Sequence, residues 1–549
     1  MIGTNKPRSL ARRLLVATST AAALADAAAP LPAPLPATAP TRPPNILFCI
    51  ADDQSFPHAS AYGCTWVNTP AFDQVAREGL LFRRAYTPNA KCAPARANIL
   101  TGRQSWQLGA AANHCPFYPP GYRTFMEALA LRGYATGFTG KGWAPGDPGA
   151  GAGGKPRELT GPEFNARELA PPASGISKTD YAANFADFLA RRPAARPFCF
   201  WLGAREPHRP YEAGAGRRLG GKNPDALGRL PVFWPDTGAV RDDMLDYAFE
   251  IEHWDAQLAR ALALLEQAGE LDNTIIVVTS DNGMPFPRAK GTTYELSLHV
   301  PLAIRWPAGV TRPGRVVEDF VSFVDFAPTI LEAAGLTAET AGMEPFAGRS
   351  LFPILRDTHQ GKIASYRESL VFGQERHDLG RPGDAGYPVR GCIQDGLLYF
   401  RNFEPSRWPM CDPITGYLNT DGSPTKTLIL VENRRGLNHW RWDLNFGRRP
   451  PEELYDFARD PDCVNNLAGD TAYAGKMRAM RALLHAELTR QQDPRLEGRG
   501  GEFDAHPYAS RARGLYGRIV EKHERVPTPW AGDDDREAPG FDPERPGVR

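Results

Sequence analysis

A cysteine, a proline and an arginine at positions 92, 94 and 96 form a combination that could do chemistry. Pro94 fits the first turn of a helix, where its missing N–H costs nothing and its φ is preset. Cys92 would then lie at the positive end of that helix, which favours a thiolate or a bound anion. Arg96 would lie on the same helical face and carry a fixed positive charge. The segment predicts a site for an oxyanion such as sulfate or phosphate, although a buried structural cysteine fits it equally well.

Acidic side chains follow two apolar runs that predict buried parallel strands. Asp52 and Asp53 follow one run, and Asp281 and Asn282 follow the other. Because ligands of open α/β sheets lie beyond the carboxyl ends of the strands, we expect these side chains to lie close together. Oxygen donors without cysteine or histidine partners favour a hard cation, Ca²⁺ or Mg²⁺. A single Asp-Asp pair more often caps a helix, so the prediction depends on the second strand.

Further side chains lie where they could bind an oxyanion or move a proton. Lys141 follows a short strand-like run, and Lys290 lies in a short loop after Asp281. His208 lies in a turn flanked by prolines and could act as a general acid. Taken alone, each of these residues is also what a solvated loop would carry.

The composition is that of an ordinary globular protein that can bury more than one core. Hydrophobic residues make up 42% of the chain and charged residues 23%, with a formal net charge of +1. That charge argues against general nucleic-acid binding, but it is compatible with a local basic pocket. The chain has 8 cysteines without zinc-type spacing, and their pairing stays open.

The N-terminus has the pattern of an export signal. Basic residues precede an apolar run at 14–25, and a small-residue cleavage site follows it. The run is too short for a good membrane span, and Arg12-Arg13 could form a twin-arginine signal. We therefore expect an exported protein, periplasmic or secreted, with residues 1–27 as the signal and residues 28–44 as an Ala/Pro-rich linker.

Taken together and in order, these motifs resemble those of the type I sulfatase family. The pattern Cys-x-Pro-x-Arg at 92–96 is the family's own, with Ala95 where serine is usual. The other motifs follow in the family's order: Asp52-Asp53, Gly-Lys141-Gly, Pro207-His208, Asp281-Asn282-Gly283, Lys290 before Tyr294-Glu295, Glu453–Asp460 and Asn466-Leu-Ala. The resemblance covers about residues 45–490 and favours the functional interpretation of each motif.

The resemblance implies an α/β fold, an alkaline-phosphatase-like sandwich. A large mixed, mostly parallel sheet would form the catalytic sulfatase domain over residues 45–360. A smaller antiparallel sheet would form a C-terminal subdomain over 361–490, which agrees with its strand-like runs between turns and with a predicted helix over 474–490. Residues 491–549 are polar with little periodicity, so we expect an extended or partly disordered tail there.

The family also implies a mechanism. Cys92 would be oxidised to formylglycine by a formylglycine-generating or sulfatase-maturating enzyme, and the hydrate of this aldehyde is the nucleophile. Arg96, Lys141 and Lys290 would offset charge on the sulfuryl oxygens, and His208 would protonate the leaving group. Ca²⁺, favoured over Mg²⁺, would be held by Asp52, Asp53, Asp281, Asn282 and the modified Cys92.

One position departs from the family's pattern. Many sulfatases have Gly-Lys-x-His, whereas Trp143 stands at the histidine position here. That histidine normally helps to release sulfate from the enzyme. Either another base serves in its place, for instance His114, or turnover is slow.

The stretch 280–290 looks most like the heparan N-sulfatase, or sulfamidase, branch, and 230–236 and 371–373 have similar counterparts there. We therefore expect a sulfated amino sugar or a related sulfated carbohydrate as substrate. Arg376 and His377 are the candidates for binding it from the C-terminal part, although an exposed turn explains them equally well.

Two other functions stay open on the sequence. Relatives of the same fold hydrolyse phosphodiesters or phosphonates, and some share the cysteine motif. One set of Asp and Asn ligands favours a single Ca²⁺ over a two-metal phosphatase. The other alternative is a non-catalytic protein that binds sulfated glycans, which Trp143 would suit.

Overall fold

The computed structural model describes residues 1, 3, 42–363, 366–528 and 530–542. Apart from residues 1 and 3, the predicted export signal and the linker up to residue 41 therefore lie outside the described residues. Among the helices within these ranges, none has both the length and the apolar character needed to cross a membrane. All 8 cysteines lie within the described ranges, and they are free rather than paired.

A mixed sheet lies at the centre of the larger part of the protein. In the described residues it has 7 strands in the order β4-β5-β1-β6-β7-β2-β8. Strands β4, β5, β1 and β6 run parallel, and β7 is antiparallel to both of its neighbours. The predicted mostly parallel sheet is confirmed. The strands are β1 (Asn45–Ala51), β2 (Leu80–Phe82), β4 (Ala135–Gly140), β5 (Phe198–Gly203), β6 (Thr274–Ser280), β7 (Leu302–Arg305) and β8 (Arg315–Val317).

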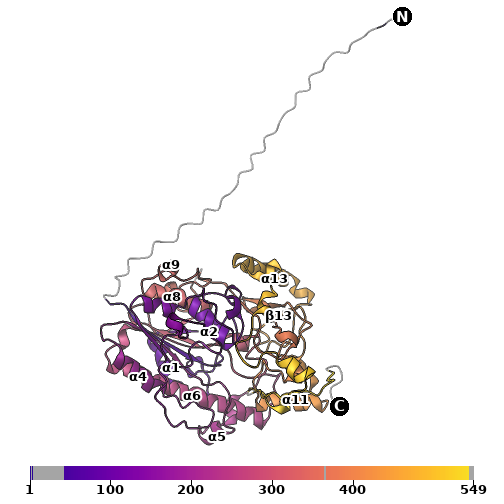
Figure 1. The fold of residues 1–549 in the computed structure, drawn as a ribbon, viewed down its shortest axis with the longest axis horizontal. Helices are drawn as coiled ribbons and strands as arrows, with labels where there is room; N and C mark the ends of the chain where they lie inside the picture. Colours follow the sequence, from indigo (N-terminus) through magenta and orange to yellow (C-terminus); the bar gives the residue numbers. More distant parts are fainter. Residues whose placement is uncertain (2, 4–41, 364–365, 529, 543–549) are drawn as a thin grey trace. The chain divides into compact units, whose positions relative to one another are not determined.

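Helices cover both faces of this sheet, because its central strands are apolar on both sides. Ile46, Phe48 and Ile50 of β1 share one core with α2, α3 and α8, whereas Leu47 and Cys49 share another with α1, α4 and α6. Figure 1 shows the two helical layers. The helices are α1 (Pro70–Glu78), α2 (Cys92–Thr101), α3 (Phe125–Leu131), α4 (Tyr181–Arg191), α5 (Ala215–Arg218), α6 (Gly238–Gln267), α7 (Glu295–Leu298), α8 (Phe326–Ala333), α9 (Ala338–Ala341), α10 (Phe352–Arg356), α11 (Pro424–Arg434), α12 (His439–Phe446), α13 (Ala474–Arg490) and α14 (Glu502–Ala505).

A separate antiparallel sheet follows in the C-terminal part, as predicted. Its strand order is β10-β11-β12-β13. Helix α13 packs on it through Met480 and Leu484, and α13 has the bounds that the sequence predicts. The strands of this sheet are β10 (Ser369–Gln374), β11 (Val389–Gln394), β12 (Leu397–Asn402) and β13 (Glu452–Asp456), and a short pair is formed by β3 (Ala85–Tyr86) and β9 (Val321–Ser322).

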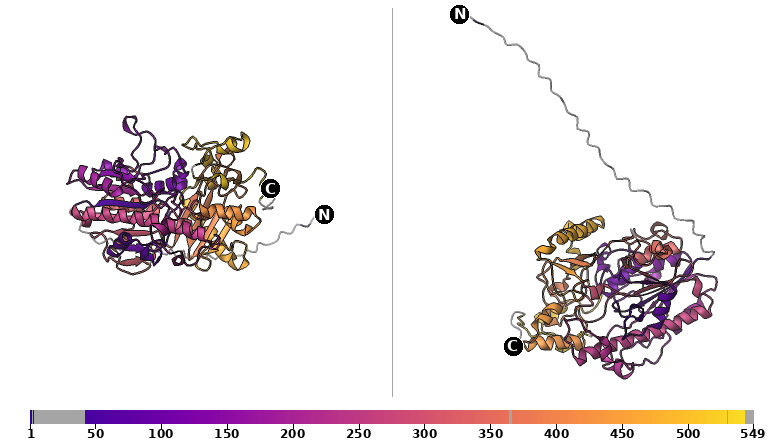
Figure 2. Two further views of the ribbon diagram at one scale, coloured as in Figure 1. Left: turned by 90° about the horizontal axis from the view of Figure 1, so that it is seen from below. Right: turned by 180° about the vertical axis from the view of Figure 1, so that it is seen from behind.

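The described residues after α13, 491–528 and 530–542, pack against the rest of the protein, whereas we expected an extended or partly disordered tail. Phe503 and Leu515 are fully buried, and Asp493 pairs with the buried Arg390 at 2.7 Å. These anchors are isolated between polar residues, so they leave no periodic pattern in the sequence. Residues Arg42–Arg549 form one compact unit, in which the C-terminal segments lie against the large-sheet part (Figure 2).

Candidate active site

The ends of β1 and β6 bring the predicted acidic side chains together. Asp52, Asp53, Asp281 and Asn282 follow these strands and are all buried. The backbone N–H of Asp53 donates to Asp281 Oδ1 at 3.1 Å, and Asn282 Nδ2 donates to Asp53 Oδ1 at 2.7 Å. One oxygen each of Asp52, Asp53 and Asp281 lies within 4.8 Å of the others. The acidic side chains therefore lie close together, as expected for the ends of two neighbouring parallel strands.

These oxygen atoms fit a hard cation. Carboxylates packed this closely repel one another unless positive charge lies next to them. Asn282 Oδ1 is buried and, among the described residues, has no hydrogen-bond partner, which leaves it free as a ligand. Burial raises the pKa of Asp281 to about 7, against the effect of Arg96, and a bound cation would keep this carboxyl ionised. Oxygen ligands of this kind suit Ca²⁺ or Mg²⁺.

Two lysine side chains pair with the acidic cluster and offset its negative charge. Lys141 Nζ lies 2.6 Å from Asp52 Oδ2, and Lys290 Nζ lies 2.6 Å from Asp53 Oδ2. Burial opposes the ionisation of Asp52, but Lys141 and Arg96 lower the pKa of its carboxyl well below the usual value. Both lysines also line the cavity described below, so they can face an anionic ligand.

Arg96 lies behind the acids and is fully buried. Its Nε donates to Asp281 Oδ2 at 2.9 Å, and Nη2 donates to Asp52 Oδ1 at 3.1 Å. Nη1 donates to the backbone carbonyls of Lys141 and Gly142 at 2.8 and 2.9 Å. The sequence suggested a direct contact with the oxyanion, but these bonds direct the guanidinium to the acids and to the Lys141 loop. Arg96 thus holds the groups that form the site.

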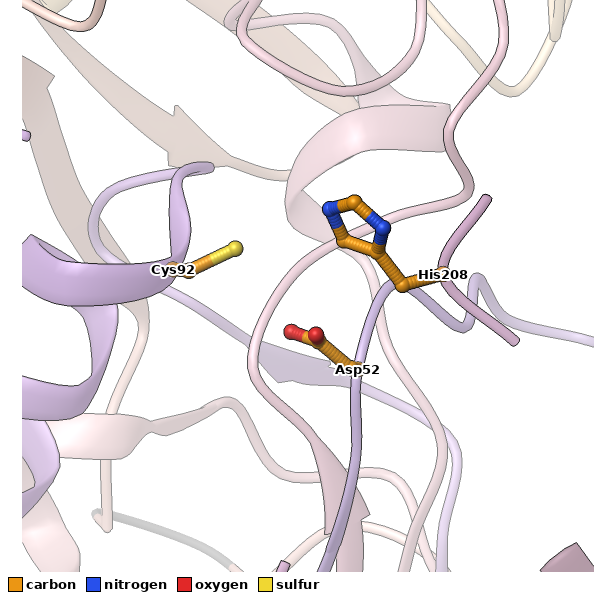
Figure 3. Close-up of side chains that lie close together, drawn as sticks. All are labelled: Asp52, Cys92 and His208. Carbon is orange, nitrogen blue, oxygen red and sulfur yellow. The ribbon is translucent and has the colours of Figure 1, made fainter. Parts of the chain in front are cut away.

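Cys92 is the first residue of α2, and Figure 3 shows its side chain directed toward Asp52 and His208. Its Sγ lies 3.9 Å from Asp53 Oδ1. Sγ, an oxygen of Asp52 and a ring nitrogen of His208 lie within 4.8 Å of one another. Burial and the charge of Asp52 raise the pKa of the thiol, although Lys141 lowers it. Burial beside carboxylates therefore opposes the thiolate that the helix N-terminus alone would favour.

His208 lies in the loop after β5 and is partly exposed to the cavity. Its Nδ1 donates to the backbone carbonyl of Arg209 at 2.7 Å. Its Nε2 lies 3.7 Å from Asp53 Oδ2. Because Nδ1 is occupied, Nε2 is the nitrogen that can exchange a proton with a ligand in the cavity.

A cavity of about 560 Å³ lies over these side chains. Sequence reasoning missed several residues of its wall, because they come from loops without a local signal. Three of these residues, Lys91, Arg209 and Asp378, directly adjoin predicted site residues, which is the hint that the sequence contains. The missed residues that line the cavity include Lys91, Arg205, Arg209, Asp378, Asp421, Tyr508, Ser510 and Trp530.

Trp143 stands where the family's pattern has a histidine, and His114 is the base suggested in its place. Trp143 is buried, and its Nε1 donates to the carbonyl of Ala93 in the first turn of α2 at 3.1 Å. His114 lines the cavity and is bound through Nδ1 to Asp378 Oδ1 at 3.1 Å. Its Nε2 is buried and has no partner within the described ranges. Burial lowers the pKa of His114 although Asp378 raises it, so the ring is neutral near pH 7.

Arg376 and His377, predicted to bind substrate, do not line this cavity. Both are buried. The Arg376 guanidinium lies 5.7 Å from the centre of the Tyr508 ring, and His377 Nε2 is bonded to Asn89 Oδ1 at 2.7 Å. Their side chains are therefore used in packing, and Asp378 is the neighbour that reaches the cavity.

Comparison with known protein families assigns the site to a class. The family model described as Sulfatase matches residues 44–336, a range that contains the acidic cluster, Cys92, Lys141 and Lys290. The chain therefore belongs to the sulfatase family. As such it is a hydrolase of sulfuric esters or sulfamates.

Curated relatives match along most of the chain. Human N-sulphoglucosamine sulphohydrolase is 29% identical over 483 residues, which cover 82% of this chain and 91% of the relative. An N-acetylglucosamine-6-O-sulfatase of Bacteroides thetaiotaomicron is 25% identical over 546 residues, which cover 82% and 88%.

Solved structures share the alkaline-phosphatase-like fold. One, described as a complex with its substrate D-glucosamine-2-N,6-O-disulfate, has a TM-score of 0.56 at 21% identity and covers 82% of this chain and 99% of its own. A phosphonate monoester hydrolase of Agrobacterium radiobacter has a TM-score of 0.55 at 19% identity, with 83% and 97% covered. At these identities the similarity extends to the fold alone.

Proposed function

We propose that this sulfatase removes sulfate from a sulfated amino sugar or a related sulfated glycan. The observation that carries the proposal is the cavity over Cys92, where lysines suited to a sulfuryl group lie beside a cluster of acids. A volume of about 560 Å³ is enough for a sugar ring. Two relatives named above are described by glucosamine-based substrates, which supports the same class here.

The proposal includes formylglycine at position 92 and a bound Ca²⁺, for which Mg²⁺ is the alternative. The metal would be held by Asp52, Asp53, Asp281, Asn282 and the modified residue 92. When bound, the cation polarises a sulfuryl oxygen, and formylglycine supplies an oxygen nucleophile in place of the buried thiol. A formylglycine-generating or sulfatase-maturating enzyme would make the modification, and the N-terminal signal would direct the protein to the periplasm or the medium.

The protein's own side chains would take the remaining catalytic roles. Lys141 and Lys290 offset the charge of the sulfuryl oxygens along the cavity wall. His208 Nε2 gives a proton to the leaving atom. Arg96 keeps the acids in place from behind, and His114 is our candidate base for the release of sulfate, because its Nε2 is free.

The test begins with the mass of the tryptic peptide Cys92–Arg96 from protein made in its native host. We expect the aldehyde mass, together with sulfate release from sulfated amino sugars that a chelator abolishes and added Ca²⁺ restores. The Cys92→Ala variant should keep its circular dichroism and thermal midpoint but release no sulfate. An unmodified cysteine in active protein, or hydrolysis of phosphodiesters without release of sulfate, would contradict the proposal.

A further inference from the structure

Asp421 is an acid in a cavity whose lysines suit an anion. It lies in the loop before α11, in the C-terminal part of the chain, and it lines the same cavity as Cys92. Its Oδ2 accepts a hydrogen bond from Lys290 Nζ at 2.9 Å. One of its carboxylate oxygens lies within 4.8 Å of a ring nitrogen of His208 and of an Asp53 oxygen. Asp421 is therefore next to the group to which we assign the proton transfer.

A carboxylate at this place weakens the binding of an anionic sulfuryl group. Lys290 does not need Asp421 to balance its positive charge, because its Nζ already lies 2.6 Å from Asp53 Oδ2. A second acid beside the proton donor suits a ligand group that donates a hydrogen bond or carries positive charge. The group of the substrate that meets the proton donor is the leaving atom.

The two kinds of leaving atom of a sulfatase substrate differ in whether they can donate a hydrogen bond. In a sulfate ester the bridging atom is oxygen, which only accepts hydrogen bonds. In a sulfamate it is nitrogen, which carries a hydrogen and donates one, and the released amine becomes an ammonium ion near pH 7. A carboxylate accepts from the nitrogen and attracts the ammonium ion, whereas it repels the lone pairs of the ester oxygen.

We propose that Asp421 makes this sulfatase selective for sulfamates, by accepting a hydrogen bond from the leaving nitrogen and by stabilising the ammonium product. This inference rests on the proposed function and adds to it the bond that is cleaved. The S–N bond breaks and its electron pair stays on nitrogen, which takes the proton of His208 Nε2, while the sulfuryl group passes to the attacking hydroxyl oxygen, whose own proton is released to water. A second proton, from water, gives the ammonium ion beside Asp421.

The test compares substrates that differ in the leaving atom, N-sulfoglucosamine and glucose 2-O-sulfate. We expect the native enzyme to prefer the sulfamate in kcat/KM, and Asp421→Asn to lower that preference by about tenfold or more, the size of one charge-assisted hydrogen bond. Asp378→Asn is the matched control. Asp378 also lines the cavity, but it is paired with Lys91 and His114, so its variant should affect both substrates alike.

Each other outcome has a definite meaning. Equal losses for both substrates in Asp421→Asn would mean that Asp421 only positions Lys290, and the inference would fail. A native enzyme that prefers the ester would also overturn it and would leave the sulfatase function intact. Release of sulfate from neither substrate would overturn the inference, and release from no sulfated amino sugar or glycan at all would overturn the proposed function as well.

A binding measurement tests the same point without turnover. Calorimetry should show that Asp421→Asn binds glucosamine, the cationic product, about tenfold more weakly than the native protein does. The affinity for glucose, which lacks the ammonium group, should not change. Equal affinities of the two proteins for glucosamine would overturn the inference.

Discussion

The guanidinium of Arg96 connects the ends of β1 and β6 with the loop after β4. It donates to Asp52 and Asp281 and to two backbone carbonyls of that loop. A planar group with five N–H donors can make these bonds at once, whereas the single ammonium of lysine cannot. The geometry of the acidic cluster therefore depends on a side chain that lies behind it.

We expect Arg96→Lys to lower both the affinity for Ca²⁺ and kcat/KM by about 10- to 100-fold, because the acids lose the partner that orients them. The measurement is sulfate release as a function of Ca²⁺ concentration. Arg103→Lys, a change just beyond the same helix and outside the acidic cluster, is the control and should behave as the native enzyme. An unchanged dependence on Ca²⁺ in Arg96→Lys would contradict this role.

Among the elements, helix α6 supports the loop that carries the candidate metal ligands. The Tyr247 hydroxyl on α6 accepts from the backbone N–H of Ser55 at 3.1 Å and is bonded to His58 Nδ1 at 3.0 Å. Burial lowers the pKa of His58 to about 3, so its ring is neutral near pH 7 and can accept from the tyrosine. The helix thus positions the chain that follows Asp53.

The same histidine makes stability depend on pH. Because its pKa is lower in the folded state than the unfolded value of about 6.5, the unfolded chain takes up the proton first as the pH falls. The contribution of the neutral ring to the free energy of unfolding is complete above pH 6.5. It decreases as the pH falls toward the folded pKa of about 3, by at most about 1.4 kcal/mol per pH unit.

We expect His58→Gln, which keeps an acceptor for Tyr247, to flatten the fall of the thermal midpoint between about pH 6.5 and pH 5. His359→Gln changes an exposed histidine and should leave the slope as it is in the native protein. Identical slopes for the native protein and His58→Gln would show that His58 does not contribute.

On the scale of the whole molecule, the cavity is enclosed by segments that are far apart in the chain. Cys92 belongs to the large-sheet part, Asp421 to the C-terminal part and Trp530 to the last segment described. Trp530 Nε1 donates to the carbonyl of Leu418 at 3.1 Å, and the Trp530 carbonyl accepts from the N–H of Gly422 at 2.7 Å. The C-terminal segment is thus attached to the loop that carries Asp421.

We expect Trp530→Ala to raise KM for a sulfated sugar by about 3- to 10-fold, because the indole provides apolar wall for the ring. Inhibition by inorganic sulfate, which needs only the charged end of the cavity, should not change. Trp440→Ala, a change at an exposed tryptophan, serves as the control for both readouts. A parallel change in sulfate inhibition would instead indicate a general disturbance of the site.

The parts of the molecule that have local patterns could be predicted. The apolar run of β1 followed by two aspartates predicted a strand with buried acids at its end, and the helix α13 was predicted with its bounds. Asp421 could not be found in this way, because it meets its partner Lys290 across 131 residues and no local pattern marks such a loop acid. Arg96 was found, but not the direction of its side chain, which depends on acids from two strands.

The burial of Cys92 has a consequence for the order of events in the life of this protein. All residues of α2 are buried, so the folded protein offers no free segment that a modifying enzyme could hold. The proposed conversion of the cysteine therefore belongs to the time before this helix packs. A chain that folds first keeps a buried thiol with a raised pKa and stays inactive. If folding outpaces conversion, cells will contain two populations with the same fold, distinguishable by mass.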